Sequence, residues 1–358
     1  MSRFLSKKYT LLTPYTPGEQ PRDARYVKLN TNESPYPPSP AVVAAAHREA
    51  ERLNLYCDPE CTQLRIAAAR HYGVEPENVL PVNGSDEMLY FAFLAFGDAE
   101  NPFAFADISY GFYPVYARFC GVPSREIPLK SDLSIDYRDY LGIPEHILIA
   151  NPNAPTGGCL PLWQIERIVR ENPGRVVIVD EAYIDFGGES CVPLTMRYDN
   201  LLVVQTFSKS RSLAGARLGF GIGNAELLRD LNTVKYAINP YNVNRMTQAA
   251  GVAAIEDDAY YRENARQIMA VRADTAQRLR ALGFTVLPSS ANFLFAGSGA
   301  IGGEALYLAL KARGVLVRHF SKERIRDFCR ITIGTREQME ILLQTIREIM
   351  SEKGSKRI

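Results

Sequence analysis

The chain has 358 residues, of which 46% are hydrophobic and 23% charged, a composition typical of globular proteins. Its 41 basic and 40 acidic side chains leave a formal net charge of +1, which argues against a general attraction to nucleic acid or to anionic membranes. The length predicts two domains.

No signal for secretion or membrane insertion is visible in the sequence. The first thirty residues lack a continuous apolar run, and no segment reaches the ~18 apolar residues of a membrane span. The six cysteines and four histidines do not form a metal-ligand spacing. We therefore expect a cytoplasmic protein with reduced cysteines and no metal site.

The N-terminal part of the chain changes character near residue 40. Residues 1–40 contain many prolines and little periodicity, which predicts an extended arm. Helical patterns follow over 41–53, 60–72 and 88–96. Ser85 or Asp86 would be a suitable N-cap for the third of these helices.

Short apolar runs then alternate with helical stretches. The runs that predict strands lie at 103–105, 146–150, 176–179, 201–204 and 217–222, with helical patterns such as 112–120 and 162–171 between them. This alternation predicts an α/β domain with a mostly parallel central sheet flanked by helices. Ligands bind such sheets beyond the carboxyl ends of the strands, where Asp180 and Lys209 fall.

The last third of the chain has a different pattern. A charged helical region reaches about Leu282, and a closing helix begins near Arg336. Strand patterns between them lie at 284–287, 291–295, 315–317 and 329–333. We expect a smaller α+β C-terminal domain over 244–358, after an arm over 1–40 and a large domain over 41–243.

Lys209 is the first candidate catalytic residue. It follows an apolar strand, stands between Ser208 and Ser210, and precedes Arg217 by eight residues. A surface lysine is the simpler explanation, but small residues follow this one and favour a cleft. Because an unpaired ammonium is costly to desolvate, a lysine there indicates an imine-forming nucleophile.

Asp180 and Tyr183 follow the neighbouring strand, and one turn of helix would bring both to the same face. Asp180 could simply cap a helix, whereas Glu181 is expected to face solvent or to act as a cap. An amine, an acid, a phenol, hydroxyls and a guanidinium at strand ends are what a pyridoxal phosphate pocket requires.

Other segments supply further candidate contacts. The helix opening at Asn83–Asp86 offers backbone N–H groups to an anion, and Tyr110 could stack on a planar ring. Phe112 and Tyr113 are expected to pack in the core. An amide of the loop Asn151–Gly158 could reach a ring hydroxyl or a carboxylate. Arg330 and Arg318 are cations of the C-terminal domain, suited to a carboxylate and a second anion.

Taken together, these residues resemble the fold type I, class I/II pyridoxal phosphate-dependent aminotransferases. The segments that carry the resemblance are Gly84-Ser85-Asp86, Tyr110, Pro155-Thr156-Gly157, Asp180–Tyr183, Ser208-Lys209, Leu213–Arg217 and Arg330. It covers nearly the whole chain. Leu29–Tyr36, Ala182–Phe186 and Arg330–Arg336 are most similar to the histidinol-phosphate aminotransferase branch.

The resemblance implies a role for each matched residue. Lys209 would form the imine with the cofactor and move a proton, Asp180 would pair with the pyridine nitrogen, and Tyr183 with the ring hydroxyl. The phosphate would be held by Gly84, Ser85, Asp86, Ser208 and Arg217, joined by Tyr56 of the partner subunit. Arg330 would bind the substrate α-carboxylate, and Arg318, Tyr15 and Tyr241 would surround the substrate side chain.

One position departs from the family pattern. The family usually reads Asn-Pro-Thr-Gly, and its asparagine contacts the cofactor ring, but here that position is Ala154. We expect Asn153 to take over this contact through a shifted loop. Otherwise the contact is weakened and Tyr183 carries it.

The implied activity is conversion of imidazole-acetol phosphate and glutamate to histidinol phosphate and 2-oxoglutarate. Ping-pong kinetics and a homodimer with shared active sites are also implied. Three alternatives remain open: an aromatic amino-acid aminotransferase, a threonine-phosphate decarboxylase and a non-catalytic, cofactor-binding regulatory module.

Overall fold

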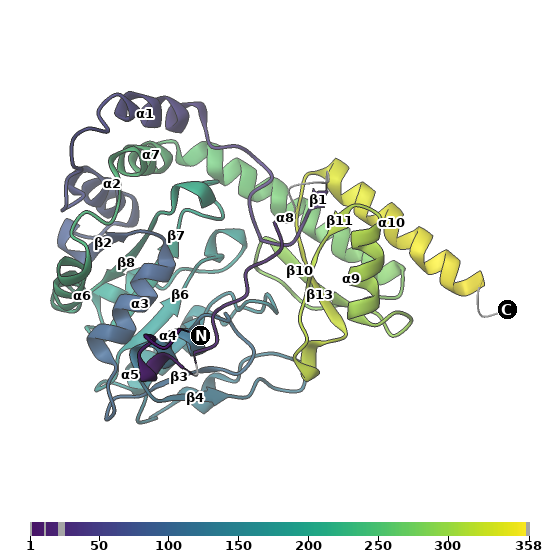
Figure 1. Cartoon of the computed structure of the whole chain (residues 1–358), viewed down its shortest axis with the longest axis horizontal. Helices are drawn as coiled ribbons and strands as arrows, with labels where there is room; N and C mark the ends of the chain where they lie inside the picture. Colours follow the sequence, from purple (N-terminus) through teal and green to yellow (C-terminus); the bar gives the residue numbers. More distant parts are fainter. Residues whose placement is uncertain (1, 11, 21–25, 356–358) are drawn as a thin grey trace.

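The computed structural model describes residues 2–10, 12–20 and 26–355. Figure 1 shows a large unit built around one sheet and a smaller unit formed by the C-terminal third, with the long helix α8 (Asp258–Ala281) running between them. Residues 1, 11 and 21–25 of the expected arm, and the last three residues of the expected C-terminal domain, lie outside the described residues.

The large unit contains a seven-stranded sheet. Its strands, in spatial order, are β2 (Val79–Val82), β8 (Gly219–Gly223), β7 (Leu201–Thr206), β6 (Val177–Asp180), β5 (His146–Ala150), β3 (Phe103–Ala106) and β4 (Ser124–Ile127). β8 runs antiparallel to both of its neighbours, and the other pairs are parallel. The predicted mostly parallel α/β fold is confirmed.

Side-chain alternation along the strands builds two cores, one on each face of the sheet. On β7, Leu201 and Val203 join one core, while Leu202 and Val204 join the other. Because both faces are covered, the central strands are apolar over most of their length, and polar residues stand only at their ends. Helices α2 (Thr62–Tyr72), α5 (Leu162–Glu171) and α7 (Arg245–Glu256) cover the first face, and α3 (Ser85–Phe96), α4 (Tyr113–Cys120) and α6 (Ala225–Ile238) cover the second. Helix α1 (Pro40–Ala50) packs on α7.

The small unit is an antiparallel sheet packed against helices. Its strand order is β12 (Arg318–His319), β13 (Phe328–Thr332), β10 (Phe293–Gly297) and β9 (Thr285–Val286). Apolar residues of this sheet form one core with α8, α9 (Gly303–Ala312) and α10 (Arg336–Ser355). The chain begins this unit much earlier than expected, because β1 (Val27–Lys28) pairs in parallel with β11 (Val315–Leu316).

Two expectations about organisation need correction. Helix α7 packs on α1 and α2, and its buried side chains join the core of the large unit. Along α8, Tyr261 belongs to the first core but Ala265 to that of the small unit. We therefore place the boundary inside α8 rather than at residue 243. Residues 27–32 of the expected arm are part of the folded body.

Several elements lacked a sequence signal strong enough to predict them, including β2, β4 and α6. Short 3-10 helices complete the structure: η1 (Lys7–Tyr9), η2 (Pro76–Asn78), η3 (Tyr137–Tyr140), η4 (Ile184–Phe186), η5 (Val192–Met196), η6 (Ala214–Ala216) and η7 (Glu323–Ile325). Within the described ranges, no helix combines the length and apolar character needed to cross a membrane.

Candidate active site

A cavity of about 290 Å³ opens beyond the carboxyl ends of β6 and β7. Its wall comes from both units and contains Thr31, Glu33, Ser85, Asp86, Tyr110, Ala150, Pro152, Ala154, Asp180, Ala182, Tyr183, Thr206, Ser208, Lys209, Ala214 and Arg217. Most of the cofactor contacts predicted from the sequence therefore meet here. Among the polar residues of the wall, Thr31, Glu33 and Thr206 were not predicted.

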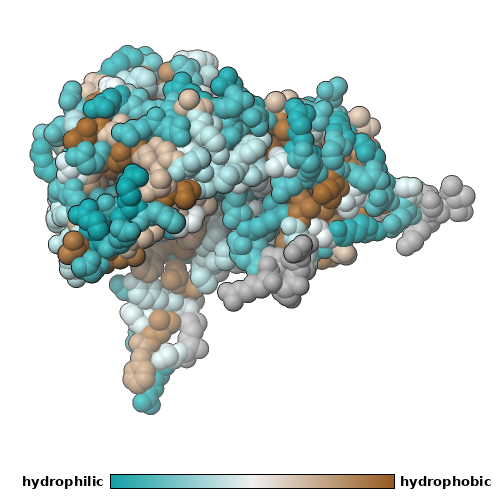
Figure 2. Space-filling view, turned by 90° about the horizontal axis from the view of Figure 1, so that it is seen from above, coloured by the Kyte–Doolittle hydropathy of each residue, from teal (hydrophilic) through white to brown (hydrophobic). Residues whose placement is uncertain are grey.

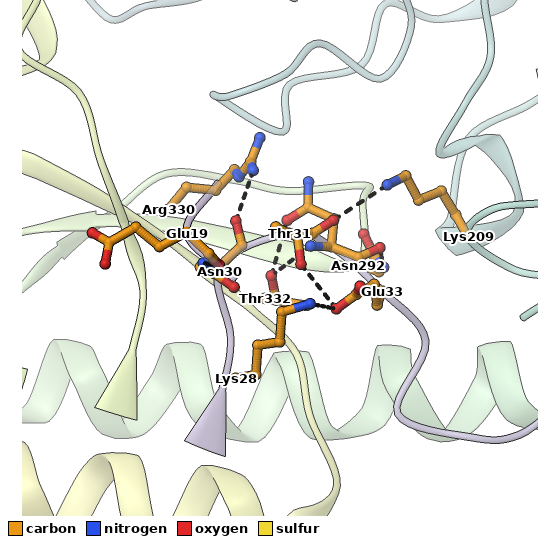
Figure 3. Close-up of polar contacts among 10 residues, drawn as sticks. Glu19, Lys28, Asn30, Thr31, Glu33, Lys209, Asn292, Arg330 and Thr332 are labelled. Carbon is orange, nitrogen blue, oxygen red and sulfur yellow. Dashed lines mark hydrogen bonds and ion pairs between the residues drawn. The ribbon is translucent and has the colours of Figure 1, made fainter. Parts of the chain in front are cut away.

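Lys209 reaches the cavity from the loop after β7. Its Nζ lies 3.4 Å from the main-chain oxygen of Thr31 and 5.7 Å from the ring centre of Tyr183. Figure 3 shows the lysine approaching Thr31 from one side while Arg330 lies on the other. Among the described residues, no carboxylate forms a direct ion pair with Lys209, so its amine is available to a ligand.

Asp180 ends β6 at the bottom of the cavity. Its Oδ2 accepts a 2.8 Å hydrogen bond from the Tyr113 hydroxyl, and its Oδ1 accepts one of 3.1 Å from the Ala182 N–H. Burial raises the pKa of Asp180 to about 6. A cationic N–H group in the cavity would favour its ionised form. Tyr113 was expected only to pack in the core; it is buried, but its hydroxyl also serves the site.

The phenol of Tyr183 has a partner that the sequence did not predict. Asn32 donates from Nδ2 to the Tyr183 hydroxyl oxygen over 2.9 Å. Instead of the expected helical turn, the segment after β6 forms a turn followed by η4. Tyr183 nevertheless lines the cavity together with Asp180.

The expectation for Asn153 is wrong. Its Nδ2 donates to the Ile108 oxygen (3.0 Å) and to Thr156 Oγ1 (2.9 Å), and its Oδ1 accepts from Ser109 Oγ (2.8 Å). The amide is therefore fully engaged behind the wall, and Ala154 faces the cavity instead. No loop shift brings an amide to this side.

One end of the cavity is built to hold an anion. Helix α3 begins there, with Gly84 as its N-cap at φ 82° instead of the expected Ser85 or Asp86. Arg217 donates from Nη2 to Asp86 Oδ2 over 3.1 Å and from Nη1 to Ser208 Oγ over 3.5 Å. The Tyr110 hydroxyl donates to Asp86 Oδ1 over 2.8 Å. Free backbone N–H groups, hydroxyls and a guanidinium together suit a phosphate.

Gly219 on β8 allows this end of the cavity to form. A Cβ atom at this position would lie 2.4 Å from the backbone nitrogen of Ser85 and 2.8 Å from the Gly84 carbonyl carbon. Any side chain on Gly219 would therefore push the start of α3 away from β8. Ser210 does not contribute, because its hydroxyl donates to Asp185 instead.

Glu181 corrects another expectation. Its carboxylate is buried rather than solvent-facing, and it accepts from Ser190 Oγ, the Cys191 N–H and Gln205 Nε2. Burial raises the pKa of Glu181 to about 7. Asp180 and Glu181 are adjacent in sequence, yet only Asp180 lines the cavity.

Arg330 and Arg318 face each other across β13 and β12. Arg330 donates from Nη2 to the Asn30 oxygen over 3.1 Å, and its Nε is buried without a hydrogen-bond partner among the described residues. Burial lowers the pKa of Arg330. Arg318 donates to the main-chain oxygens of Thr16 (2.9 Å) and Pro17 (3.1 Å), so it ties the N-terminal segment to the small unit.

The three predicted tyrosines lie in two places. Tyr15 stacks on Phe112, with ring centres 4.2 Å apart, and lies 6.1 Å from the Tyr110 ring. Tyr56 and Tyr241 stack on each other at 4.6 Å and are exposed by 82% and 42%. Neither of this second pair lines the cavity of its own chain.

The residues present fit pyridoxal phosphate. The start of α3 with Arg217 matches a phosphate. No cation of the described residues forms a direct ion pair with the buried Asp180 carboxylate, and a protonated pyridine would supply one. The unpaired Nε of Arg330 is suited to a substrate carboxylate. No cluster of three or more metal-ligating side chains occurs in the part of the chain that the structure describes.

Comparisons with known proteins agree with this geometry. The family model for aminotransferase class I and II matches residues 24–346. Histidinol-phosphate aminotransferase 1 of Bradyrhizobium diazoefficiens is 51% identical over 350 residues, covering 98% of this chain and 100% of the relative. Histidinol-phosphate aminotransferase of Brachyspira hyodysenteriae is 47% identical, covering 98% and 99%.

Solved structures give the same fold. Histidinol-phosphate aminotransferase from Sinorhizobium meliloti in complex with pyridoxal-5'-phosphate superposes with a TM-score of 0.82 at 24% identity, covering 91% of each chain. An aminotransferase from Mycobacterium tuberculosis gives a TM-score of 0.82 at 25% identity, covering 92% of each.

Proposed function

Because this chain belongs to the class I and II aminotransferases, which depend on pyridoxal phosphate, we propose that it is a histidinol-phosphate aminotransferase. Its reaction exchanges the amino group between glutamate and imidazole-acetol phosphate, giving 2-oxoglutarate and histidinol phosphate. Two full-length relatives at 51% and 47% identity carry that name, and this supports the choice of substrate.

Each wall of the cavity has a role in holding the cofactor. Bound there, pyridoxal phosphate supplies an aldehyde for imine formation and a ring that withdraws electrons from the substrate Cα. Ser85, Asp86, Ser208 and Arg217 would hold its phosphate, with the backbone at Gly84. Tyr110 would pack against its ring, and Asp180, supported by the Tyr113 hydrogen bond, would keep the ring nitrogen protonated.

Lys209 and Tyr183 act on the reacting side of the ring. With the cofactor bound, Lys209 Nζ would be the amine that forms the imine with its aldehyde, and the same amine would be the base placed to move a proton at the substrate Cα. The Tyr183 hydroxyl would bind the ring oxygen, and Asn32 holds that hydroxyl in place.

The remaining side chains select the substrate. Arg330 binds the α-carboxylate of glutamate through the fork that includes its unpaired Nε. Arg318 retains N–H groups beyond those that hold Thr16 and Pro17, and we assign these to the phosphate of histidinol phosphate. Tyr15 contributes an aromatic wall beside the imidazole, next to Tyr110.

The protein is further proposed to be a cytoplasmic homodimer with shared sites. Exposed apolar side chains gather after α1 and near the end of α6, namely Leu53, Leu55, Tyr56, Tyr236, Ile238 and Tyr241. Figure 2, which views the molecule from the side where α1 lies in Figure 1, shows brown apolar patches in a mainly hydrophilic surface. In a dimer, Tyr56 and Tyr241 would complete the neighbouring cavity.

The observation that carries the proposal is the convergence of Lys209, Asp180 and the start of α3 on one cavity, while Arg330 binds Asn30, the residue before Thr31 of the cavity wall. A half-reaction panel tests it: the purified enzyme with pyridoxal phosphate receives one amino donor at a time. Histidinol phosphate and glutamate should each convert the bound cofactor to its amine form.

The same panel separates the other candidates. Fast conversion by phenylalanine or tyrosine but not by histidinol phosphate would identify an aromatic aminotransferase. Release of CO₂ from threonine phosphate would identify a decarboxylase. Failure of every donor, with the cofactor bound, would indicate a regulatory module.

A further inference from the structure

Three consecutive residues, Asn30, Thr31 and Asn32, each touch a different residue of the site. The Asn30 oxygen accepts from Arg330, the Thr31 oxygen lies 3.4 Å from Lys209 Nζ, and the Asn32 side chain donates to Tyr183. In Figure 3 this segment crosses between Arg330 and Lys209. A segment expected to be a loose arm thus connects the carboxylate-binding, amine and phenol groups.

The Asn32 side chain is held in one orientation. It is 1% exposed, and its backbone adopts a φ of 56°, a conformation that asparagine tolerates better than most residues. Thr332 Oγ1 accepts from the Asn32 backbone N–H over 3.0 Å and donates to Asn32 Oδ1 over 3.0 Å. Because Oδ1 faces the Thr332 hydroxyl, the NH₂ group must face Tyr183.

This orientation decides what Tyr183 can do. A phenol carries one proton and can accept from another donor. Since Asn32 occupies an acceptor position of the Tyr183 oxygen, the Tyr183 proton is free to point into the cavity. The family position that usually supplies a second donor to the cofactor ring is Ala154 in this chain, and Asn153 is engaged elsewhere.

We infer that Asn32 is a positioning residue that replaces, from a distant segment of the chain, the amide missing at Ala154. It acts through Tyr183: by donating to the phenol oxygen, it directs and strengthens the Tyr183 hydrogen bond to the ring oxygen of the cofactor. The inference rests on the proposed cofactor site but not on the identity of the amino-acid substrate.

The charged and titratable groups that face Tyr183 come from several elements. Lys209 lies on the loop after β7, Arg330 on β13, Asp180 at the end of β6 and Tyr113 on α4. Asn32→Gly leaves all four in place and adds no charge, so a change in proton affinity at the cofactor in this variant can be attributed to the phenol contact.

The experiment measures the pH midpoint of the visible absorption change of the bound cofactor, in wild type, Asn32→Asp and Asn32→Gly. A carboxylate cannot donate, so Asn32→Asp would draw the Tyr183 proton away from the ring. Glycine keeps the positive φ and removes the amide without adding charge. We expect the midpoint to rise by about one pH unit in Asn32→Gly and further in Asn32→Asp.

Two further variants control this result. Ser34→Ala removes a hydroxyl of the same segment that accepts from Ser212 Oγ over 2.9 Å and does not line the cavity, so it should leave the midpoint unchanged. Adding Ala154→Asn to Asn32→Gly should return the midpoint toward the wild-type value, because it restores a donor on the other side.

An unchanged midpoint in both Asn32→Gly and Asn32→Asp would overturn the inference. So would an equal shift in Ser34→Ala, since that would indicate general loosening of the segment. If wild type shows no absorption band that depends on Lys209, the proposed function fails instead, and the two failures are thereby distinguished.

Discussion

Tyr113 donates its hydroxyl proton to Oδ2 of Asp180 over 2.8 Å, and both side chains are buried. Burial raises the pKa of Asp180 to about 6, and the Tyr113 hydrogen bond acts in the opposite direction. The site thus contains an acid whose charge is unfavourable in the empty protein, and a cationic ring nitrogen would remove that cost.

Asp180→Asn is therefore expected to stabilise the cofactor-free protein near pH 8, by up to about 3 kcal/mol. The folded-state pKa of Asp180 lies above its ordinary value of 3.8. The protonated Asp180 side chain therefore contributes its full stability to the folded protein below pH 3.8, and this contribution is lost as pH rises through about 6. Thermal unfolding of the apoprotein across this range should show the gain of the variant shrinking toward acid pH.

With pyridoxal phosphate bound, the order should reverse, because only the wild-type carboxylate can pair with a protonated ring. An Asp180→Asn apoprotein that is less stable than wild type at every pH would contradict the assigned desolvation cost. Tyr113→Phe is the companion variant. It should weaken cofactor binding, because the remaining carboxylate becomes harder to ionise.

Gly219→Ala should lower the affinity for pyridoxal phosphate and the melting temperature. Its added Cβ would lie 2.4 Å from the Ser85 nitrogen, so α3 and the anion-binding end of the cavity must shift. Overpacking of this kind costs ~1–3 kcal/mol. Gly215→Ala is the matched control, because a methyl group added there would meet no atom within 4 Å.

Fluorescence titration of the apoprotein with pyridoxal phosphate measures both variants. We expect a dissociation constant at least about tenfold higher for Gly219→Ala, and a value close to wild type for Gly215→Ala. Equal affinity in both variants would show that the approach of β8 to α3 does not shape the site.

Lys209→Ala should remove the visible absorption band of the bound cofactor and reduce turnover by at least about 10²–10⁴-fold. The reason is that no other lysine lines the described wall of the cavity. Ser210→Ala is the control, since the neighbouring hydroxyl faces Asp185 and not the cavity. Turnover by Lys209→Ala at the wild-type rate would refute the assignment of the nucleophile.

The sequence predicted site residues best where a reactive side chain stands at or just after the end of an apolar strand. Lys209 and Asp180 could be predicted because an apolar run leads directly to each of them, and strand ends meet at one sheet edge. Asn32 could not, because its partners Tyr183 and Thr332 lie 151 and 300 residues away. The segment Leu29–Tyr36 carries a family resemblance, but the prolines at its end and just beyond it, at 35, 37, 38 and 40, indicate an extended arm.

Local sequence patterns also predicted the wrong location for polar residues whose hydrogen-bond partners are inside the protein. Glu181 was expected to face solvent or to act as a cap, because nothing nearby in sequence indicates its partners, Gln205 and Ser190. Asn153 was expected in the cavity because of its place beside Ala154. The orientation of that loop depends on contacts with Ile108 and Ser109, which no spacing in the sequence reveals.

Arg330→Ala should raise the KM for glutamate by about 10–100-fold while leaving cofactor affinity nearly unchanged, because the lost contact is a charge-assisted pair with a carboxylate. Arg318→Ala should instead raise the KM for histidinol phosphate more than the KM for glutamate. Steady-state kinetics with both donors gives the two ratios. Loss of cofactor from Arg330→Ala, or equal effects of Arg318→Ala on both donors, would contradict these roles.

Tyr56 provides the test of the shared site. Its ring is 82% exposed and does not line its own cavity, so its proposed phosphate contact requires a second copy of the chain. If Tyr56→Ala and Lys209→Ala subunits are mixed, a hybrid dimer contains one site with both residues intact. Random exchange should then restore about a quarter of wild-type activity.

A mixture of Lys209→Ala with Arg330→Ala is the matched control. Lys209 and Arg330 are both bound by the segment Asn30–Thr31 of the same chain, so each serves the same cavity. No hybrid of these two variants contains an intact site, and activity should stay at the level of the separate proteins. Restoration in both mixtures, or in neither after subunit exchange is verified, would show that Tyr56 does not cross to the neighbouring site.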